Sequence, residues 1–301
     1  NSVQSNTICL AWQKAFGIDP ATMGIVLTLL TLLIIFGGIQ RVAKFSSTVV
    51  PVMAIIYLLI AVGVVIWNIT CLPQVLLTIV ENAFGFNQAA GGVLGVTVIQ
   101  GIKRGLFSNE AGEGSAPNAA AAATVSHPVK QGLIQALGVF TDTLVVCSCT
   151  AFIILVSGVD VTASNGIQLT QDALTHEIGS IGNPFVAVMI WLFAFSSIIG
   201  NYYYGETNVR YIKDSKLGVF IYRLAVAAMV MIGAVVSLDF AWSFADITMA
   251  LLTLCNLVAI VLLSRQAVFL LQDYRQQKKE GKNPVFSKDK MPEIADQLEA
   301  W

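Results

Sequence analysis

Two apolar runs decide the fold class: GIVLTLLTLLIIFGGI at 24–39 and VVPVMAIIYLLIAVGVVIW at 49–67. Each approaches the ~20 residues that an α-helix needs to cross a ~30 Å hydrocarbon layer. Neither run alternates between polar and apolar residues, which argues against the strands of a membrane β-barrel. Similar runs recur along the chain, so the sequence predicts an all-α polytopic membrane protein.

The composition agrees with this prediction. Of the 301 residues, 56% are hydrophobic and only 12% are charged, and the mean hydropathy is +0.75. Soluble domains carry roughly 25% charged residues, so this chain has too little polar surface to cover a water-soluble protein. The net charge of −1 and the absence of a basic patch give no reason to expect a nucleic-acid partner. The five cysteines and two histidines show no metal-ligand spacing, so no metal site is predicted.

Six spans are evident from hydropathy, and the positions of basic residues predict a seventh. Cytoplasmic loops are enriched in Lys and Arg, and the charge clusters near 41–44, 103–104, 130, 210–216 and 265–282 can all lie inside only if residues 84–103 also cross. The C-terminus is then cytoplasmic. We expect a transmembrane domain over 1–264 and a charged tail over 265–301. The predicted spans are 20–40, 50–69, 84–103, 132–157, 184–205, 217–238 and 245–264.

Several polar residues interrupt these spans. Asp142 lies about 15 Å into its span, where a charge costs at least ~2.5–3.5 kcal/mol and should therefore face an ion, a cavity or a partner. Thr143, which follows it, would share an α-helical face with Cys147 and Thr150. The alternative is a hydrogen bond that only holds helices together. We interpret Asp142 and Thr143 as candidate ion ligands.

The serine pair at 196–197 and Asn256 can also be interpreted either as ligands or as contacts between helices. Ser196 and Ser197 lie mid-span, and their hydroxyls are the hard oxygen donors that a sodium ion would use, although serine also serves as a small packing residue. Asn256 lies in the middle of the last span and contacts either another helix or the transported solute. The sequence leaves both alternatives open.

The segment SNEAGEGSAPN at 108–118 is unusually rich in glycine and polar residues. It follows a glycine-rich span that contains Gly91, Gly92 and Gly95, and glycine-interrupted hydrophobic segments point to the binding sites of secondary transporters. Ser115 before Ala116–Pro117 predicts a new helix start, because proline is favoured in the first turn. An ordinary cytoplasmic loop is the alternative. The candidate substrate-binding residues are Gly91, Gly92, Gly95, Ser108, Asn109, Glu110, Thr143 and Asn256.

The segment RGLFSNEAGEGSAPNAAAA at 104–122 closely resembles the signature of the alanine/glycine:cation symporter family, also called the sodium:alanine symporters. The likeness continues through HPVKQGLIQALGVFTDTLVVCSCTAFIIL at 127–155 and FAFSSIIGNYYYGE at 193–206. It implies a leucine-transporter-like inverted-repeat fold of about eleven spans, of which about seven are present. It also implies Na⁺-coupled uptake of alanine or glycine across a prokaryotic plasma membrane, with Na⁺ as the coupling ion and no other cofactor.

The resemblance also sets further expectations. The family's first-half motif, which lines the substrate and sodium sites, is absent, so we expect a C-terminal part that does not transport alone. Three residues depart from the family's pattern: Glu113 for an apolar residue, Cys255 for proline and Ser197 for threonine. The weaker alternatives are a proton-coupled or passive carrier and, remotely, an intramembrane enzyme that uses Ser108 or Ser115 with His127 and Glu110.

Overall fold

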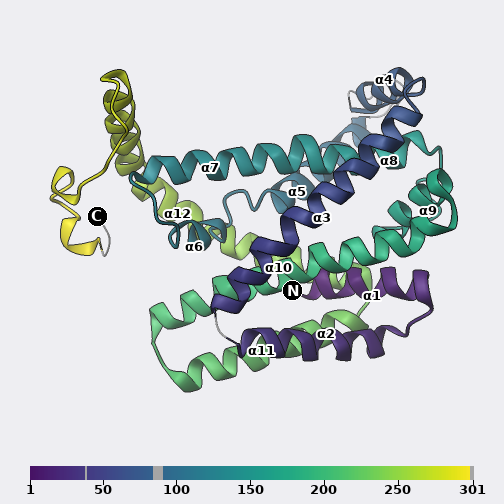
Figure 1. Ribbon diagram of the computed structural model, residues 1–301, viewed down its shortest axis with the longest axis horizontal. Helices are drawn as coiled ribbons and strands as arrows, with labels where there is room; N and C mark the ends of the chain where they lie inside the picture. The colour runs from purple at the N-terminus through teal and green to yellow at the C-terminus, as the bar shows by residue number, and fades with distance from the viewer. Residues whose placement is uncertain (38, 84–90, 299–301) are drawn as a thin grey trace. The chain divides into compact units, whose positions relative to one another are not determined.

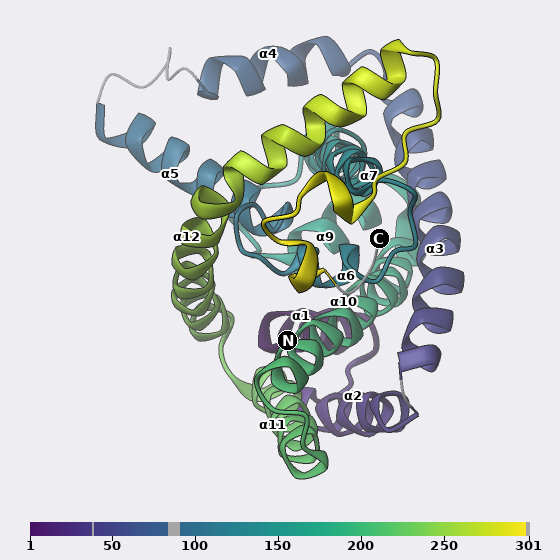
Figure 2. The ribbon, with the colours of Figure 1, turned by 90° about the vertical axis from the view of Figure 1, so that its left-hand side faces the viewer.

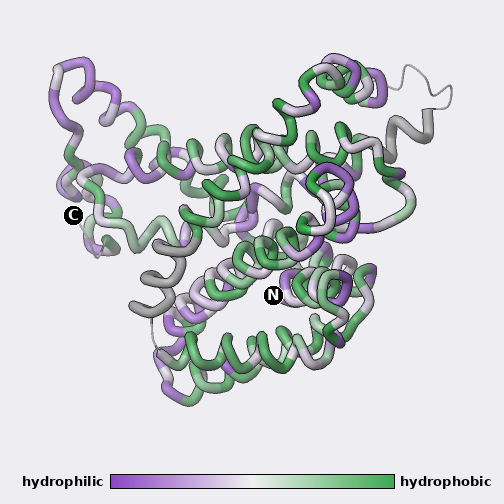
Figure 3. The backbone as a smooth tube through the Cα atoms, turned by 45° about the vertical axis from the view of Figure 1, so that its right-hand side comes forward, coloured by the Kyte–Doolittle hydropathy of each residue, from purple (hydrophilic) through white to green (hydrophobic). Residues whose placement is uncertain are grey.

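The computed structural model describes residues 1–37, 39–83 and 91–298, which form helices and turns without a β-strand. The chain divides into two compact units, Asn1–Gly105 with Thr143–Thr248, and Leu106–Asp142 with Met249–Trp301. Polar residues concentrate in the connections and in the C-terminal segment, while the long helices are predominantly apolar (Figure 3). This distribution is the one expected of helices that span a bilayer.

The first unit contains most of the helices. They are α1 (Ser2–Phe16), α2 (Pro20–Ile35), α3 (Ile39–Trp67), α4 (Leu72–Ala83), most of α5 (Gly91–Ser108), most of the π-helix η1 (Asp142–Cys147), α8 (Ser148–Val156), α9 (Ile167–Ile178), the 3-10 turn η2 (Gly179–Ile181), α10 (Gly182–Ile212), α11 (Lys216–Val235) and the start of α12 (Leu238–Lys279).

Two apolar clusters hold the first unit together. Helices α1, α2, α10 and α11 pack side by side (Figure 1) around a core that includes Leu27, Phe195 and Val230. The second cluster joins α3, α8, α9 and α10 and includes Met53 and Ile153. Helix α3 runs as one long helix (Figure 2). Helix α10 contributes to both clusters and therefore connects them.

Helix α1 was not predicted as an element, and it is one of the most buried parts of the first unit. Its Ser5 hydroxyl donates to the Val230 carbonyl at 2.7 Å, and the Asn6 amide donates to the carbonyls of Gly233 and Val236 at 3.0 and 2.7 Å. Gly233 leaves so little room that an added Cβ would lie 2.5 Å from the Ser2 backbone. Close backbone approach and polar side-chain contacts therefore fix α1 against α11.

Five helical segments are long and apolar enough to cross a membrane, which supports the prediction of a multi-pass membrane protein. They are Val50–Trp67, Pro128–Val156, Ile167–Ile212, Lys216–Val235 and Leu238–Lys279. The most apolar stretch of α12 contains no residue that is buried within the protein, as expected of a surface in contact with lipid. The predicted span 20–40 corresponds to the shorter apolar helix α2, and the span 84–103 lies partly outside the described residues.

One ion pair bears on that seventh crossing. The Arg104 guanidinium donates to both carboxylate oxygens of Asp246 at 3.0 and 2.9 Å, and it lies over the Trp242 ring. The charge pattern places Arg104 inside, whereas the order of the later spans places Asp246 outside. The pair does not agree with a full crossing by 84–103, so the count of seven spans and the cytoplasmic C-terminus remain predictions.

The second unit contains α6 (Ala116–Ala120), α7 (Pro128–Thr141), the larger part of α12 and the 3-10 turns η3 (Lys288–Lys290) and η4 (Ala295–Gln297). Helix α12 continues without a break past residue 264, where the sequence suggested a boundary between span and tail. The segment after α12 then returns to the start of α7. There the Phe286 amide donates to the Ser126 carbonyl at 2.9 Å, and Lys130 donates to the Asn283 side chain at 2.7 Å.

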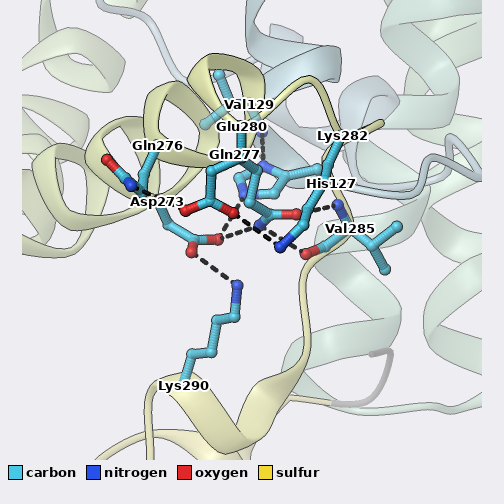
Figure 4. A network of polar contacts seen from close by, with 9 residues as sticks. All are labelled: His127, Val129, Asp273, Gln276, Gln277, Glu280, Lys282, Val285 and Lys290. Carbon is cyan, nitrogen blue, oxygen red and sulfur yellow. Dashed lines mark hydrogen bonds and ion pairs between the residues drawn. The ribbon is translucent and has the colours of Figure 1, made fainter.

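His127 lies at the centre of this return (Figure 4). Its side chain is fully buried and caps α7 by accepting from the Val129 amide at 3.2 Å. Its other ring nitrogen lies 3.2 Å from an Asp273 oxygen, and Asp273 also pairs with Lys290 at 2.7 Å. Both histidine nitrogens are therefore engaged in holding α7, α12 and the tail together.

Candidate functional site

The loop that joins α5 to α6, residues 109–115, has an unusual backbone. Three of its residues have positive φ: Glu110 at 48°, Gly112 at 79° and Gly114 at 84°. Glycine adopts this conformation freely, whereas a glutamate there is strained by roughly 1 kcal/mol. The glycines on both sides of Glu113 thus allow a left-handed backbone conformation that residues with a Cβ atom would adopt only with strain. The predicted new helix start at Ser115 is confirmed, since α6 begins directly after it.

Asn256 on α12 fixes this loop. Its amide nitrogen donates to the Gly112 carbonyl at 3.0 Å, and a Cβ added at Gly114 would lie 2.8 Å from its Cγ. Thr253 and Leu257 also lie within van der Waals distance of a Cβ built at Gly112. Of the two alternatives that the sequence left open, the structure shows a protein contact for Asn256. Its role in substrate binding remains a prediction.

Two predicted site residues meet at the end of α5. The Ser108 hydroxyl donates to an Asp142 carboxylate oxygen at 2.8 Å. Ser108 is the last residue of α5, and Asp142 ends α7 and begins the π-helix η1. The structure therefore brings a candidate substrate ligand and a candidate ion ligand into direct contact.

The π-helix itself was not predicted. A π-helix takes more residues per turn than an α-helix, so the expected shared face of Thr143, Cys147 and Thr150 does not form with α-helical spacing. Instead, the Ser148 hydroxyl donates to the Thr143 carbonyl at 3.3 Å, five residues back, and Thr150 bonds Tyr57 of α3 at 2.6 Å. Such π segments occur frequently at functional sites. Its position at Asp142 and Thr143 keeps both residues as candidates.

The predicted sodium ligands on α10 have local partners. The hydroxyls of Ser196 and Ser197 both donate to the Phe193 carbonyl, at 2.8 and 3.1 Å, which leaves their oxygen lone pairs free to accept or to coordinate. They belong to the first unit and Asp142 to the second, so the combined ion site stays a prediction. The same is true of Gly91, Gly92 and Gly95, which begin α5 but whose surroundings lie outside the described part of the chain.

The two glutamates of the loop differ sharply in their surroundings. Glu110 accepts a short hydrogen bond from the Ser115 hydroxyl. Glu113 is only 6% exposed, and within the described residues its carboxylate has neither a cation nor a hydrogen-bond donor. Burial, together with the nearby negative charge of Glu110, raises the pKa of Glu113 to about 7. The sequence marked this residue only as a departure from a family pattern and gave no sign of its burial.

The arrangement supplies carboxylate and hydroxyl oxygens beside a glycine-rich loop. Within the described part of the chain, no three His, Cys, Asp or Glu side chains converge as they would around a transition metal. Carboxylate, hydroxyl and backbone carbonyl oxygens suit Na⁺, and backbone N–H groups at a broken helix suit a substrate carboxylate.

Comparisons with known proteins identify the family. A model of the sodium:alanine symporter family matches residues 1–288. The chain is 54% identical over 290 residues to a probable sodium/glutamine symporter, GlnT, of Bacillus subtilis, covering 96% of this chain and 61% of the relative. It is 52% identical to the amino-acid carrier protein AlsT of Bacillus subtilis, covering 100% and 64%. It is 35% identical to the sodium/alanine symporter AgcS of Methanococcus maripaludis, covering 94% and 63%.

The chain thus spans about three fifths of the length of these relatives. Both the family match and the aligned relatives include the loop 109–115, the π-helix and α10. The resemblance first suggested by the segment at 104–122 is confirmed: the chain belongs to the sodium:alanine symporter family.

Proposed function

We propose that the protein takes part in Na⁺-coupled symport of a small neutral amino acid, alanine or glycine, into the cell by alternating access. The observation that carries the proposal is the family match over residues 1–288. The site of action would be a prokaryotic plasma membrane, and the fold a leucine-transporter-like inverted repeat. Na⁺ would stabilise the state that binds substrate, and by linkage the substrate would raise the affinity for Na⁺ equally.

The geometry supports this assignment. The loop 109–115 combines left-handed glycines with a hydrogen bond from Asn256, which holds it against α12. The Ser108–Asp142 hydrogen bond lies where α5 ends and the π-helix begins. A polar contact between broken helices in an apolar protein is the kind of place where a transporter binds solutes. The proposed ion ligands are Asp142, Thr143, Ser196 and Ser197.

Glutamine is a second candidate substrate. The observation in its favour is the 54% identity to a relative described as a probable sodium/glutamine symporter. The crowding of Gly114 against Asn256 favours a small substrate if this loop borders the binding site, because a longer side chain would need that space. Measuring whether glutamine competes with alanine for uptake distinguishes the two candidate substrates.

Uptake into sealed vesicles tests the proposal. The complete protein is reconstituted into proteoliposomes, and radiolabelled alanine, glycine and glutamine are supplied with and without an inward Na⁺ gradient. Accumulation that collapses when the gradient is dissipated supports symport. Equilibration without accumulation would indicate a passive carrier, and accumulation driven only by a proton gradient would indicate proton coupling.

Asp142→Asn tests the proposed ion site. We expect lower Na⁺ affinity, because the variant loses the negative charge yet keeps a similar shape. Asp239→Asn is the matched control: Asp239 is an exposed carboxylate in the first turn of α12, so its uptake kinetics should match the wild type. Kinetics of Asp142→Asn identical to those of the control would remove Asp142 from the mechanism.

The enzyme alternative finds little support in the geometry. A serine hydrolase needs a histidine free to accept a proton from the nucleophile. Both ring nitrogens of His127 are engaged, with the Val129 amide and with Asp273. The Ser108 and Ser115 hydroxyls instead donate to Asp142 and Glu110. An enzyme would consume its substrate in detergent, where no gradient exists, so the same assay without vesicles tests this alternative.

A further inference from the structure

A pocket of about 260 Å³ lies between α12 and the C-terminal segment 280–298 that follows it. Its lining combines basic and apolar side chains. From α12 it includes Arg265 and Phe269, and from the C-terminal segment it includes Lys290, Met291 and Ile294. None of the candidate substrate or ion ligands lines this pocket, so the proposed transport site does not account for it.

Specific contacts hold the C-terminal segment beside α12. The Lys290 ammonium pairs with the Asp273 carboxylate at 2.7 Å (Figure 4). Gln277 and the Val285 backbone exchange two hydrogen bonds, each of 2.9 Å. Phe286 follows directly and is only 5% exposed. Because these contacts involve side chains of α12 as well as the segment, the pocket is a defined feature of this unit.

The pocket lies where the apolar part of α12 ends. Arg265 is the first charged residue after Asp246, and the predicted span stops directly before it. Val258, Val261 and Leu262 are all more than half exposed. They precede Arg265 by seven, four and three residues, so they lie on the same helical face. An apolar surface that can contact acyl chains therefore leads directly to the pocket.

The charges of the lining favour a ligand with a single negative charge. Arg265 is exposed and makes no ion pair within the described part of the chain, whereas Lys290 shares its charge with Asp273. Glu293 is the one carboxylate among the described lining residues. Two cations and one carboxylate leave a net charge of +1, which matches the single charge of a phosphodiester. A guanidinium also binds phosphate oxygens in a bidentate manner, which adds geometric specificity.

We propose that this pocket binds the head group of a phospholipid with one phosphodiester charge, such as phosphatidylglycerol. The phosphate pairs with Arg265 and Lys290, and the acyl chains lie along the exposed apolar face of α12 that precedes Arg265. The pocket is smaller than the ~300–1,000 Å³ of most small-molecule sites, so it holds a head group and leaves the chains outside. The bound lipid would join α12 to the C-terminal segment. This inference does not depend on the proposed symport.

Thermal unfolding of the complete, delipidated protein in detergent tests the ligand class. A ligand that binds only the folded state raises the unfolding temperature as its concentration rises, so phosphatidylglycerol should raise it. Diacylglycerol with the same acyl chains lacks the phosphate and should have little effect. Inorganic phosphate, which lacks the chains, should have little effect at the same concentrations. Equal stabilisation by diacylglycerol would overturn recognition of the phosphate. Equal stabilisation by inorganic phosphate would show that the site takes a free anion and would overturn the lipid.

Variants of the lining test the location. Arg265→Gln should raise the phosphatidylglycerol concentration needed for half of the maximal stabilisation by about fivefold. Arg275→Gln is the matched control, because Arg275 is an exposed arginine further along the same helix and does not line the pocket. Equal weakening in both variants would overturn the pocket, since the lipid would then respond to the basic charges of the helix as a whole. Met291→Trp keeps every charge but fills the pocket, so it should weaken binding at least as much as Arg265→Gln. Unchanged binding in Met291→Trp would also overturn the proposal.

Discussion

Two regions of this protein place polar side chains in buried positions, and they differ in how those groups are satisfied. On α1, Ser5 and the amide nitrogen of Asn6 donate to carbonyls at the end of α11. In the loop 109–115, Glu113 is nearly as buried, yet its carboxylate has no partner within the described residues. The donors of the first region are therefore paired with carbonyls, although the side-chain oxygens of Gln4 and Asn6 are buried there without a hydrogen-bond partner among the described residues.

The difference follows from helix geometry. A helix leaves its last four carbonyls without intrahelical partners, and α11 ends at Val235, so the carbonyls of Gly233 and Val236 are available acceptors for Asn6. The loop offers Glu113 no comparable supply of donors. The side-chain donors of α1 are therefore structural, because the end of α11 supplies acceptors for them.

The largest effect is expected at Gly233, where α1 and α11 touch. Replacement by Val would place the new side chain against the Ser2 backbone, 2.5 Å from the position of Cβ, and backbone cannot rotate away. We expect Gly233→Val to lower the free energy of unfolding by about 3 kcal/mol or more. Maleimide labelling of the buried Cys9, with the other four cysteines replaced, measures the loss of α1 packing.

Gly63→Val is the matched control for this change. Gly63 also lies inside a long helix, but nothing approaches its Cβ position within 4 Å. The control should leave both stability and Cys9 protection close to wild type. If Gly233→Val also leaves Cys9 protected, α1 does not pack on α11 as described.

The next effect concerns pH and the unpartnered glutamate. The folded pKa of Glu113, about 7, lies above its ordinary value of 4.5, so the folded state binds this proton more tightly than the unfolded state. The resulting stability is fully present below pH 4.5 and is lost as the pH rises through 7. The loss reaches at most about 3 kcal/mol. Glu113→Gln should remove it, so the variant should be more stable than wild type at pH 9 and similar at pH 5.

Thermal unfolding in detergent at pH 5, 7 and 9 measures this crossover. Glu293→Gln, which changes an exposed carboxyl group of the tail, should follow the wild-type pH dependence throughout. A Glu113→Gln curve parallel to the wild type would mean that the loop exposes Glu113 to solvent.

Hydropathy predicted the long helices because the bilayer imposes their length. The expected range 217–238 corresponds closely to α11, whereas 50–69 covers only the later part of α3, which begins at Ile39, and 184–205 ends before α10, which continues to Ile212. Helix α1 was missed because its polar residues lower its hydropathy, and a sequence cannot show that they bind carbonyls of a helix more than 200 residues away. Elements defined by contact with distant chain segments are not visible to a local pattern.

In the candidate site, too, the features set by local sequence were predictable and those set by distant contacts were not. Glycine spacing and the serine before Ala116–Pro117 predicted a broken segment followed by a helix start, because these signals are local. The π-helix at Asp142 was not predictable, because the choice between α and π turns depends on packing in three dimensions. The burial of Glu113 was also hidden, because it results from the contact between its neighbours and Asn256.

A smaller effect is expected from the polar contacts of α1. Asn6→Leu removes two donors from the carbonyls of Gly233 and Val236, and should lower the free energy of unfolding by about 2 kcal/mol. Thr7→Val is a suitable control, since among the described contacts the Thr7 hydroxyl bonds the Val3 carbonyl of its own helix, and its loss should cost little. Equal stability of the two variants would show that the interhelical hydrogen bonds add nothing beyond local ones.

The smallest effect is a coupling energy at the loop. Gly114→Ala introduces a Cβ 2.8 Å from the Asn256 side chain and also strains a residue with a φ of 84°. Asn256→Ala removes the clashing atoms but leaves the strain, and it also removes the hydrogen bond to Gly112. In a double-mutant cycle the two changes should therefore be less damaging together than the sum of their separate effects, by about 1 kcal/mol. Additive effects would mean that Gly114 and Asn256 do not touch, in which case the loop is not held closed on α12 and Glu113 has no reason to remain buried.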